Sequence, residues 1–168
     1  EWVKKLYGQI GDVKAVIGDK HKYLGMTLDY STKGAIKIDM RDYVDEMLDE
    51  YPEPVTGKKT SPATEKLFVV NDSSPKLDAE KAMAFHSAVA KALFLAKRGR
   101  PDILLVVSFL STRVKQPTVE DWSKLHRMMQ WLKVTRDDLL TLAIADPEVI
   151  QWYIDAAFAA HADIKSHT

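Results

Sequence analysis

The stretch DAEKAMAFHSAVAKALFLAKRGRPDILLVVSFLSTR, residues 78 to 113, decides the fold because it encodes two helices and the corner between them. Asp78 is a favourable N-cap for a helix over about 79 to 97. Gly99 ends that helix, and Pro101 opens a second one at the position where its missing N–H is not needed. The second helix, about 101 to 113, is apolar nearly all round, so we expect it to be buried. The first should bury a stripe formed by Met83, Val89, Ala90, Leu93 and Phe94.

A third helix and two strands follow this pair. Thr118 is a suitable N-cap, and Glu120 and Asp121 are favourably placed in the first turn. The helix runs to about residue 134, with apolar residues at helical spacing at Trp122, Leu125, Met128, Met129 and Leu132. Residues 139 to 144 and 151 to 158 have the pattern of strands, separated by a turn at Asp146-Pro147.

Residues 1 to 77 predict the end of a helix, a β-hairpin, a further helix and a long loop. The strands are 21 to 29 and 35 to 39, joined by a turn at 31 to 34. Asp39 is expected to cap a helix that runs to about Glu50. Residues 52 to 76 hold four of the seven prolines, which indicates a connection with little regular structure. The fold class is α+β: a β-hairpin, a three-to-four-helix bundle, and the first strands of a truncated unit.

Composition limits the possible functions. The chain has 168 residues, 46% of them hydrophobic, which is enough for one domain with a core or for pieces of two. It has no cysteine, which excludes disulfides and thiolate zinc sites and fits an intracellular protein. Its longest apolar run, 103 to 110, is far short of the roughly 20 residues of a membrane span, and no signal peptide is visible. The absent initiator methionine and the interrupted last unit predict a fragment.

The zero net charge hides an uneven distribution. Residues 61 to 136 carry 13 Lys and Arg against 7 Asp and Glu, whereas residues 137 to 168 carry 1 against 6. A basic segment is able to follow a phosphate backbone, and an acidic one to hold divalent metal, although both also suit solvated helix faces. We find no Gly-rich phosphate loop, nucleophile elbow or Ser/His/Asp triad. The five histidines form no metal cluster, since His161 and His167 near Asp163 are not ligands that Mg²⁺ requires.

Several strings resemble the Pol polyprotein of copia-type retrotransposons, from the end of the reverse transcriptase palm through the thumb into RNase H. The most specific is Arg-Pro-Asp-Ile at 100 to 103, and Tyr-Leu-Gly-Met at 23 to 26 is similar to a strand after the polymerase site. Two departures are Val134 and Ala90, where the family has glycine. The remaining similar strings are 43 to 48, 88 to 95, the set Trp122, Arg127, Leu132, Lys133 and Thr135, and Asp155 to Ala159 with Asp163 and Ser166.

The resemblance implies three parts: the end of the palm at 1 to 38, thumb helices at 39 to 136, and the truncated start of an RNase H-like α/β domain at 137 to 168. Asp155 would be the first RNase H carboxylate and a metal ligand, or else a hydrogen-bonded structural residue. Two-metal hydrolysis requires several carboxylates around ions about 4 Å apart. We therefore expect Mg²⁺ or Mn²⁺ in the intact parent and no tightly bound metal here. Because the Tyr-Val-Asp-Asp string of the family is absent, this chain alone should be inactive.

The resemblance also implies a template-primer duplex or RNA/DNA hybrid as partner, together with the rest of the Pol polyprotein. No membrane partner is expected, and the family's location is an intracellular virus-like particle or the nucleus. Three positions have a structural alternative: Gly25 a bulge, Arg127 an ion pair at the core edge, and Arg100 an ion pair with Asp102 at a helix start. The candidate nucleic-acid ligands are Gly25, Lys91, Lys97, Arg98, Arg100, Lys124, Arg127 and Lys133.

Two other functions remain open on the sequence. One is a non-catalytic nucleic-acid-binding or interaction module, a degenerate or domesticated remnant. The other is an unrelated helical domain without a nucleic-acid role. Salt-dependent binding to a hybrid separates the unrelated domain from the rest.

Overall fold

A computed structural model describes residues 2–12, 15–144, 146, 148–150 and 152. The helices are α1 (Trp2–Tyr7), α2 (Arg41–Asp49), α3 (Ala79–Ala96), the short 3₁₀ helix η1 (Pro101–Ile103), α4 (Leu104–Arg113) and α5 (Val119–Val134). The strands are β1 (Lys20–Tyr23), β2 (Met26–Asp29), β3 (Ala35–Asp39) and β4 (Leu140–Ala143). The strand expected over 151 to 158, with Asp155, Asp163, Ser166 and both nearby histidines, lies outside the described residues.

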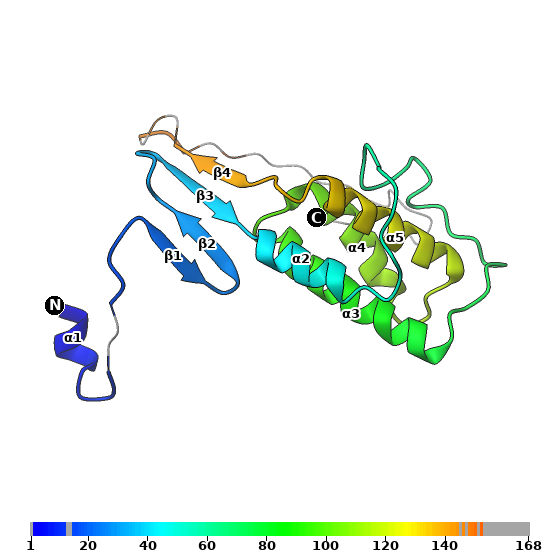
Figure 1. The fold of residues 1–168 in the computed structure, drawn as a ribbon, viewed down its shortest axis with the longest axis horizontal. Coiled ribbons are helices and arrows are strands. Elements are labelled where there is room, and N and C mark those ends of the chain that lie inside the picture. The colour runs from blue at the N-terminus through cyan, green and yellow to red at the C-terminus, as the bar shows by residue number, and fades with distance from the viewer. Residues whose placement is uncertain (1, 13–14, 145, 147, 151, 153–168) are drawn as a thin grey trace.

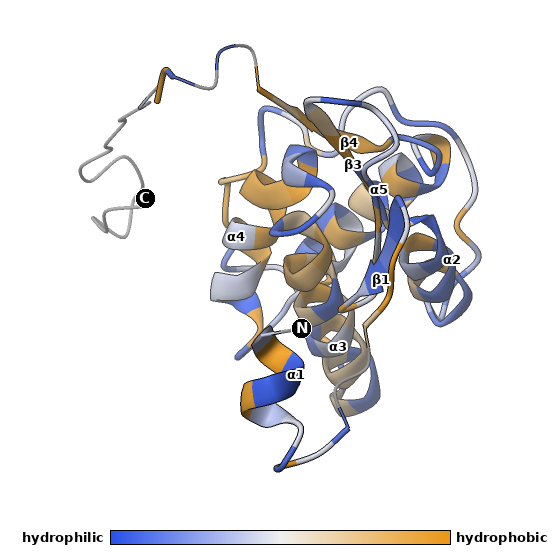
Figure 2. Ribbon diagram, turned by 90° about the vertical axis from the view of Figure 1, so that its left-hand side faces the viewer, coloured by the Kyte–Doolittle hydropathy of each residue, from blue (hydrophilic) through white to orange (hydrophobic). Residues whose placement is uncertain are grey.

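The molecule has a sheet at one end and a bundle of α2 to α5 at the other, with α1 standing apart from both (Figure 1). None of the residues of α1 is buried, and Figure 2 shows apolar and polar positions alternating around it. The α+β class is thus confirmed. No helix among the described residues has the length and apolar character that crossing a membrane requires.

The sheet is antiparallel throughout, in the order β1-β2-β3-β4. Because side chains alternate along a strand, one face turns its apolar residues to the bundle and the other carries lysines. Ile38 is buried, and Met26, Leu28, Ile36 and Leu140 pack against the same core. Residues 140 to 143 therefore complete the sheet of residues 20 to 39. The predicted domain boundaries stay predictions.

The expected strand over 21 to 29 is wrong in one respect, because it consists of two strands. Tyr23 pairs with Met26, which leaves Leu24 and Gly25 as a two-residue turn. Their φ angles are 48° and 75°. Two successive positive φ values are typical of a type I′ hairpin turn, which suits the twist of antiparallel strands. Gly25 is thus a turn residue and not a bulge.

Two helix starts agree with the sequence and one does not. The Asp78 carboxylate accepts the N–H of Lys81 at 2.8 Å, and Thr118 forms a reciprocal capping box with Asp121. The cap position of α2 is instead occupied by Met40, without a side-chain bond. Asp39 remains the last residue of β3, although its carboxylate does accept the N–H of Arg41 at 3.0 Å.

The core confirms the predicted stripe of α5 and corrects those of α3 and α4. All five expected residues of α5 are buried. In α3, Val89 is buried and the half-buried Leu93 and Phe94 pack against the core as predicted, whereas Met83 is 75% exposed and Ala90 is exposed. In α4, Leu105 is 60% exposed, because α3 and α5 cover only one side of that helix. The buried residues of α3 are Phe85, Val89, Ala92, Leu95 and Ala96.

Candidate nucleic-acid interface

The β1–β2 turn packs on an aromatic pair formed by α2 and α3. A Cβ atom at Gly25 would lie 3.8 Å from the ring of Phe94 and 3.9 Å from that of Tyr43. These two rings have their centroids 5.2 Å apart, with 31° between their planes. The turn is therefore fixed beside the C-terminal part of α3, with Leu24 itself 56% exposed.

Three of the candidate cations lie on or just beyond the C-terminal half of α3. Lys91 precedes Phe94 by three residues on the helix, Lys97 is the C-cap residue, and Arg98 follows it. The guanidinium carbon of Arg98 lies 3.6 Å from the Phe94 ring centroid, and Arg98 donates to the Phe94 carbonyl at 3.3 Å. This stacking brings Arg98 next to the β1–β2 turn. The exposed Lys97 has no side-chain partner among the described residues.

Lys91 is neutralised by α2. Its ammonium group pairs with Glu50 and, at 3.2 Å, with Glu46. The hydrogen bond to Glu50 raises the pKa of Lys91, burial opposes the rise, and Glu46 adds to it. The structure thus leaves two cations of this set without a carboxylate partner among the described residues: Arg98, which stacks on the Phe94 ring that lies against Gly25, and its exposed sequence neighbour Lys97.

The candidate cations of α5 bind the long loop of their own chain. Lys124 Nζ donates to the carbonyl of Val69 at 2.5 Å, and Lys133 Nζ to that of Val55 at 2.7 Å. Arg127 Nη2 donates to Ser61 Oγ at 3.1 Å. From Val55 to Val69 the loop therefore runs antiparallel to α5. As expected, residues 52 to 76 contain no helix or strand, and their one β-bridge joins Lys76 to Thr118.

These contacts give the cations of α5 a structural role. No carboxylate pairs with Arg127 in the described part of the chain, so the ion-pair alternative is not observed there. Its Nε is buried and without a partner. Lys124 also pairs with Glu120 at 3.3 Å and lies over the Phe109 ring. The structure therefore separates the predicted ligands into a turn-proximal group and a loop-binding group.

Arg100 lies in the corner between α3 and η1 and is only 4% exposed. It donates to both carboxylate oxygens of Asp102, at 2.9 and 2.8 Å, and to the carbonyl of Thr135 at 2.9 Å. Trp131 Nε1 also donates to Asp102, at 2.7 Å. Burial opposes ionisation of Asp102, but the bonds from Arg100 and Trp131 outweigh it and lower its pKa. This arrangement favours the ion-pair role of Arg100 over contact with a ligand.

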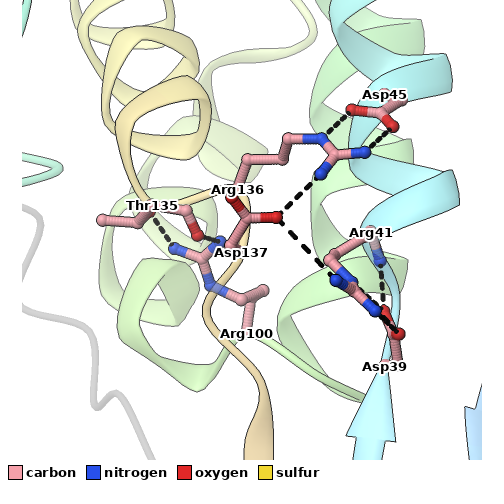
Figure 3. A network of polar contacts seen from close by, with 7 residues as sticks. All are labelled: Asp39, Arg41, Asp45, Arg100, Thr135, Arg136 and Asp137. Atoms are coloured by element: carbon pink, nitrogen blue, oxygen red, sulfur yellow. Dashed lines mark hydrogen bonds and ion pairs between the residues drawn. The ribbon is translucent and has the colours of Figure 1, made fainter.

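A second polar network joins the sheet to the bundle (Figure 3). Arg41 binds Asp39 at 2.6 Å and lies 3.9 Å from Asp137. Arg136 binds Asp137 at 2.7 Å and donates hydrogen bonds to both carboxylate oxygens of Asp45 on α2. Hydrogen bonds from Arg41 and Arg136 lower the pKa of Asp39 and of Asp45, respectively. The network fixes the sheet, and so the β1–β2 turn, relative to α2 and α5.

Acidification should weaken the ion pairs of Asp39, Asp45 and Asp102, whose pKa values are all lowered. A carboxyl group whose folded pKa lies below its ordinary value of 3.8 stabilises the fold above that value, and the stabilisation is lost as pH falls through the folded pKa. We expect the urea midpoint to be lower at about pH 3 than at about pH 6. Asp102→Asn should lose less between the two pH values than the unchanged chain, because one titrating group is gone. An equal loss in both proteins would contradict the contribution of Asp102.

The described residues contain no group of three or more His, Cys, Asp or Glu side chains placed to hold a metal ion. The predicted ligand Asp155 lies outside them, so the metal prediction stays a prediction.

Sequence reasoning missed the aromatic partners of Gly25. The sequence places Phe94 in the apolar stripe of its helix and Tyr43 in the string at 43 to 48, with no indication that the two rings meet. The available signal was Leu24-Gly25, since a residue followed by glycine between two short β-rich runs is a hairpin pattern. Dividing 21 to 29 at that pair would have placed Gly25 at a turn.

This chain is similar to two proteins described as transposon products. A yeast protein described as "Putative transposon Ty5-1 protein" (Saccharomyces cerevisiae) is 29% identical over 153 residues, which cover 90% of this chain and 49% of that protein. The "Retrovirus-related Pol polyprotein from transposon TNT 1-94" of Nicotiana tabacum is 24% identical over 169 residues, 96% of this chain and 13% of that polyprotein. The chain thus spans about half of the first relative and a small part of the second.

These homologues confirm the resemblance to a part of a copia-type retrotransposon Pol polyprotein. No protein-family model matches the chain. No solved structure matches it either.

Proposed function

We propose that this chain is the part of a retrotransposon reverse transcriptase that holds the template-primer duplex. The observation that carries the proposal is similarity to a Pol polyprotein over 96% of the chain. In the intact parent the reaction would be RNA-templated DNA synthesis, with cleavage of RNA in the hybrid. The rest of the polyprotein is then the second partner, inside an intracellular particle or the nucleus.

The β1–β2 turn offers the most suitable contact with a nucleic-acid backbone. Gly25 lacks a side chain, so a strand is able to approach the turn closely. Lys97 and Arg98 supply positive charge beside it, and Lys22 of β1 is exposed at the same end of the sheet. Contacts of this kind position a duplex without reading its sequence. The cations of α5 support the site indirectly, because they hold the long loop.

The metal chemistry belongs to the parent in this proposal. Bound Mg²⁺ or Mn²⁺ would activate water and stabilise the leaving oxygen. A single carboxylate, Asp155, does not suffice to clamp two ions, and its partners would come from further residues of the parent. We therefore expect neither primer extension nor hybrid cleavage from this chain alone, and either activity would contradict the proposal.

We expect the chain to bind an RNA/DNA hybrid with an affinity that falls by several powers of ten per tenfold rise in salt. Removing one phosphate contact should reduce the slope of log affinity against log salt by about one. Lys97→Ala should do so, and the double variant Lys97→Ala with Arg98→Ala should reduce it further. Fluorescence anisotropy of a labelled hybrid at several salt concentrations measures both slopes.

Lys33→Ala is the matched control for charge. Lys33 is exposed in the β2–β3 turn, which lies at the opposite end of the sheet from Gly25 because hairpin turns alternate along antiparallel strands. Its removal should leave the slope unchanged. Absent or salt-independent binding would contradict the proposed duplex contact. An open frame with Tyr-Val-Asp-Asp upstream in the transcript would separate a working polymerase from a domesticated remnant.

A further inference from the structure

A second basic site lies away from the sheet, where the end of the long loop meets the α4–α5 connection (Figure 1). Here the surface is hollowed by about 470 Å³. Its lining is polar and includes three cations. The main lining residues are Ser74, Lys76, Thr112, Arg113, Lys115 and Gln116.

The walls of this hollow are held by backbone hydrogen bonds. Residues 75 to 77 pair with the start of α5, through Val119 N–H to the Pro75 carbonyl at 2.9 Å and Leu77 N–H to the Pro117 carbonyl at 3.0 Å. Ser74 Oγ accepts the N–H of Glu120 at 3.2 Å. The hollow is therefore formed in the chain as it stands, without a ligand to order it.

Arg113 is oriented by a buried carboxylate. Its Nε lies 3.3 Å from each oxygen of Asp121, which is 2% exposed. Asp121 also accepts from the N–H and hydroxyl of Thr118, at 2.9 and 3.0 Å, so its position is fixed. The two terminal nitrogens of Arg113 have no partner among the described residues. A guanidinium held by Nε with its other donors free is suited to an oxyanion.

The two lysines of the hollow are also uncommitted. Within the described residues, neither Lys76 Nζ nor Lys115 Nζ has a hydrogen-bond or ion-pair partner. Asp72 also lines the hollow and Asp121 neutralises Arg113, so three cations face two carboxylates. The remaining single positive charge matches one phosphodiester group. Hydroxyl and amide groups of the lining supply further hydrogen-bond donors.

We propose that this hollow binds a phosphate group carried by a nucleic-acid strand, in contact with Arg113, Lys76 and Lys115. The assignment to a strand rests on the proposed function, whereas the phosphate site itself does not. The helix α5 begins at the hollow, and its 16 residues extend about 24 Å from there along the bundle. A duplex would thus meet a second contact, independent of the β1–β2 turn.

The test is a titration of the isotope-labelled chain with inorganic phosphate against chloride at equal ionic strength, followed by amide resonances. We expect saturable shifts at Gln116 and at the neighbouring lining residues. The double variant Lys76→Ala with Lys115→Ala should weaken binding at least about tenfold, the expected cost of lost charge-assisted contacts. Lys58→Ala, an exposed lysine of the same loop outside the hollow, is the charge-matched control and should change nothing.

A second measurement identifies the source of the phosphate. If the hollow binds one phosphate of a strand, the double variant should reduce the salt slope of hybrid binding by about one. Saturable phosphate binding with an unchanged hybrid slope would keep the site and assign it to free phosphate. Failure of Lys97→Ala to affect the hybrid would count against the β1–β2 turn alone. Absence of saturable shifts, or equal shifts in the double variant, would overturn the phosphate site.

Discussion

Arg100→Ala should lower the free energy of unfolding by about 1.5 to 3 kcal/mol, the usual cost of losing hydrogen bonds that involve a charged group. Arg100 is 4% exposed and binds Asp102, Thr135 Oγ1 and the Thr135 carbonyl. Its removal leaves Trp131 as the one remaining side-chain donor to Asp102 among the described residues, and it takes one of two donors, the other being the N–H of Asp138, from the Thr135 carbonyl. Urea unfolding followed by circular dichroism measures the loss.

Two companion variants test the reason for that loss. Arg100→Lys should recover only part of it, because an ammonium group cannot reproduce the two parallel bonds to Asp102. Arg98→Ala is the control, since Arg98 is an arginine of the same corner that is only half-buried and makes one hydrogen bond and a stacking contact. Its cost should stay near 1 kcal/mol or below. A loss below about 1 kcal/mol for Arg100→Ala would contradict the structural role of the corner.

Helix boundaries were predictable because local chemistry sets them. Asp78, Thr118 with Asp121, and Pro101 act within one turn of themselves, so the sequence contains all that is needed. The stripe of α5 was predictable for a related reason. Polar residues occupy the rest of that helix and leave one apolar side.

The stripe of α3 was not predictable in the same way. Alanine and apolar residues cover most sides of α3, so several orientations have a similar apolar content. The neighbours α2, α4 and α5 decide which side is buried, and these contacts are long-range. Tertiary packing therefore selects Phe85 over Met83.

The roles of the α5 cations depend on contacts that no local pattern contains. Lys124, Arg127 and Lys133 bind loop atoms 55, 66 and 78 residues away. Their acceptors are two backbone carbonyls, which every residue has, and one serine hydroxyl. A basic helix face over a long loop thus looks the same in sequence whether it binds phosphate or its own chain.

The positive charges of the chain therefore have two different roles, holding the loop and remaining available for a ligand. Cations covered by the loop stabilise it, whereas Lys97 at the end of α3 and Lys115 at the hollow remain free in the described structure. Added salt should therefore weaken nucleic-acid binding by Lys97 and Lys115 much more than it weakens the contacts between the α5 cations and the loop. The reason is that salt screens the attraction to charged phosphates more than it screens hydrogen bonds to neutral acceptors.

Phe85→Ala should destabilise the chain by about 3 to 5 kcal/mol, whereas Met83→Ala should change stability by no more than about 0.5 kcal/mol. Phe85 is 0% exposed, so truncation leaves a cavity in the core in addition to the lost transfer free energy. Met83 is 75% exposed, and its side chain loses little contact. The two residues differ by two positions on one helix, so Met83→Ala controls for helix propensity. Matched urea unfolding curves decide between them, and a larger loss for Met83→Ala would mean that α3 buries the stripe expected from sequence.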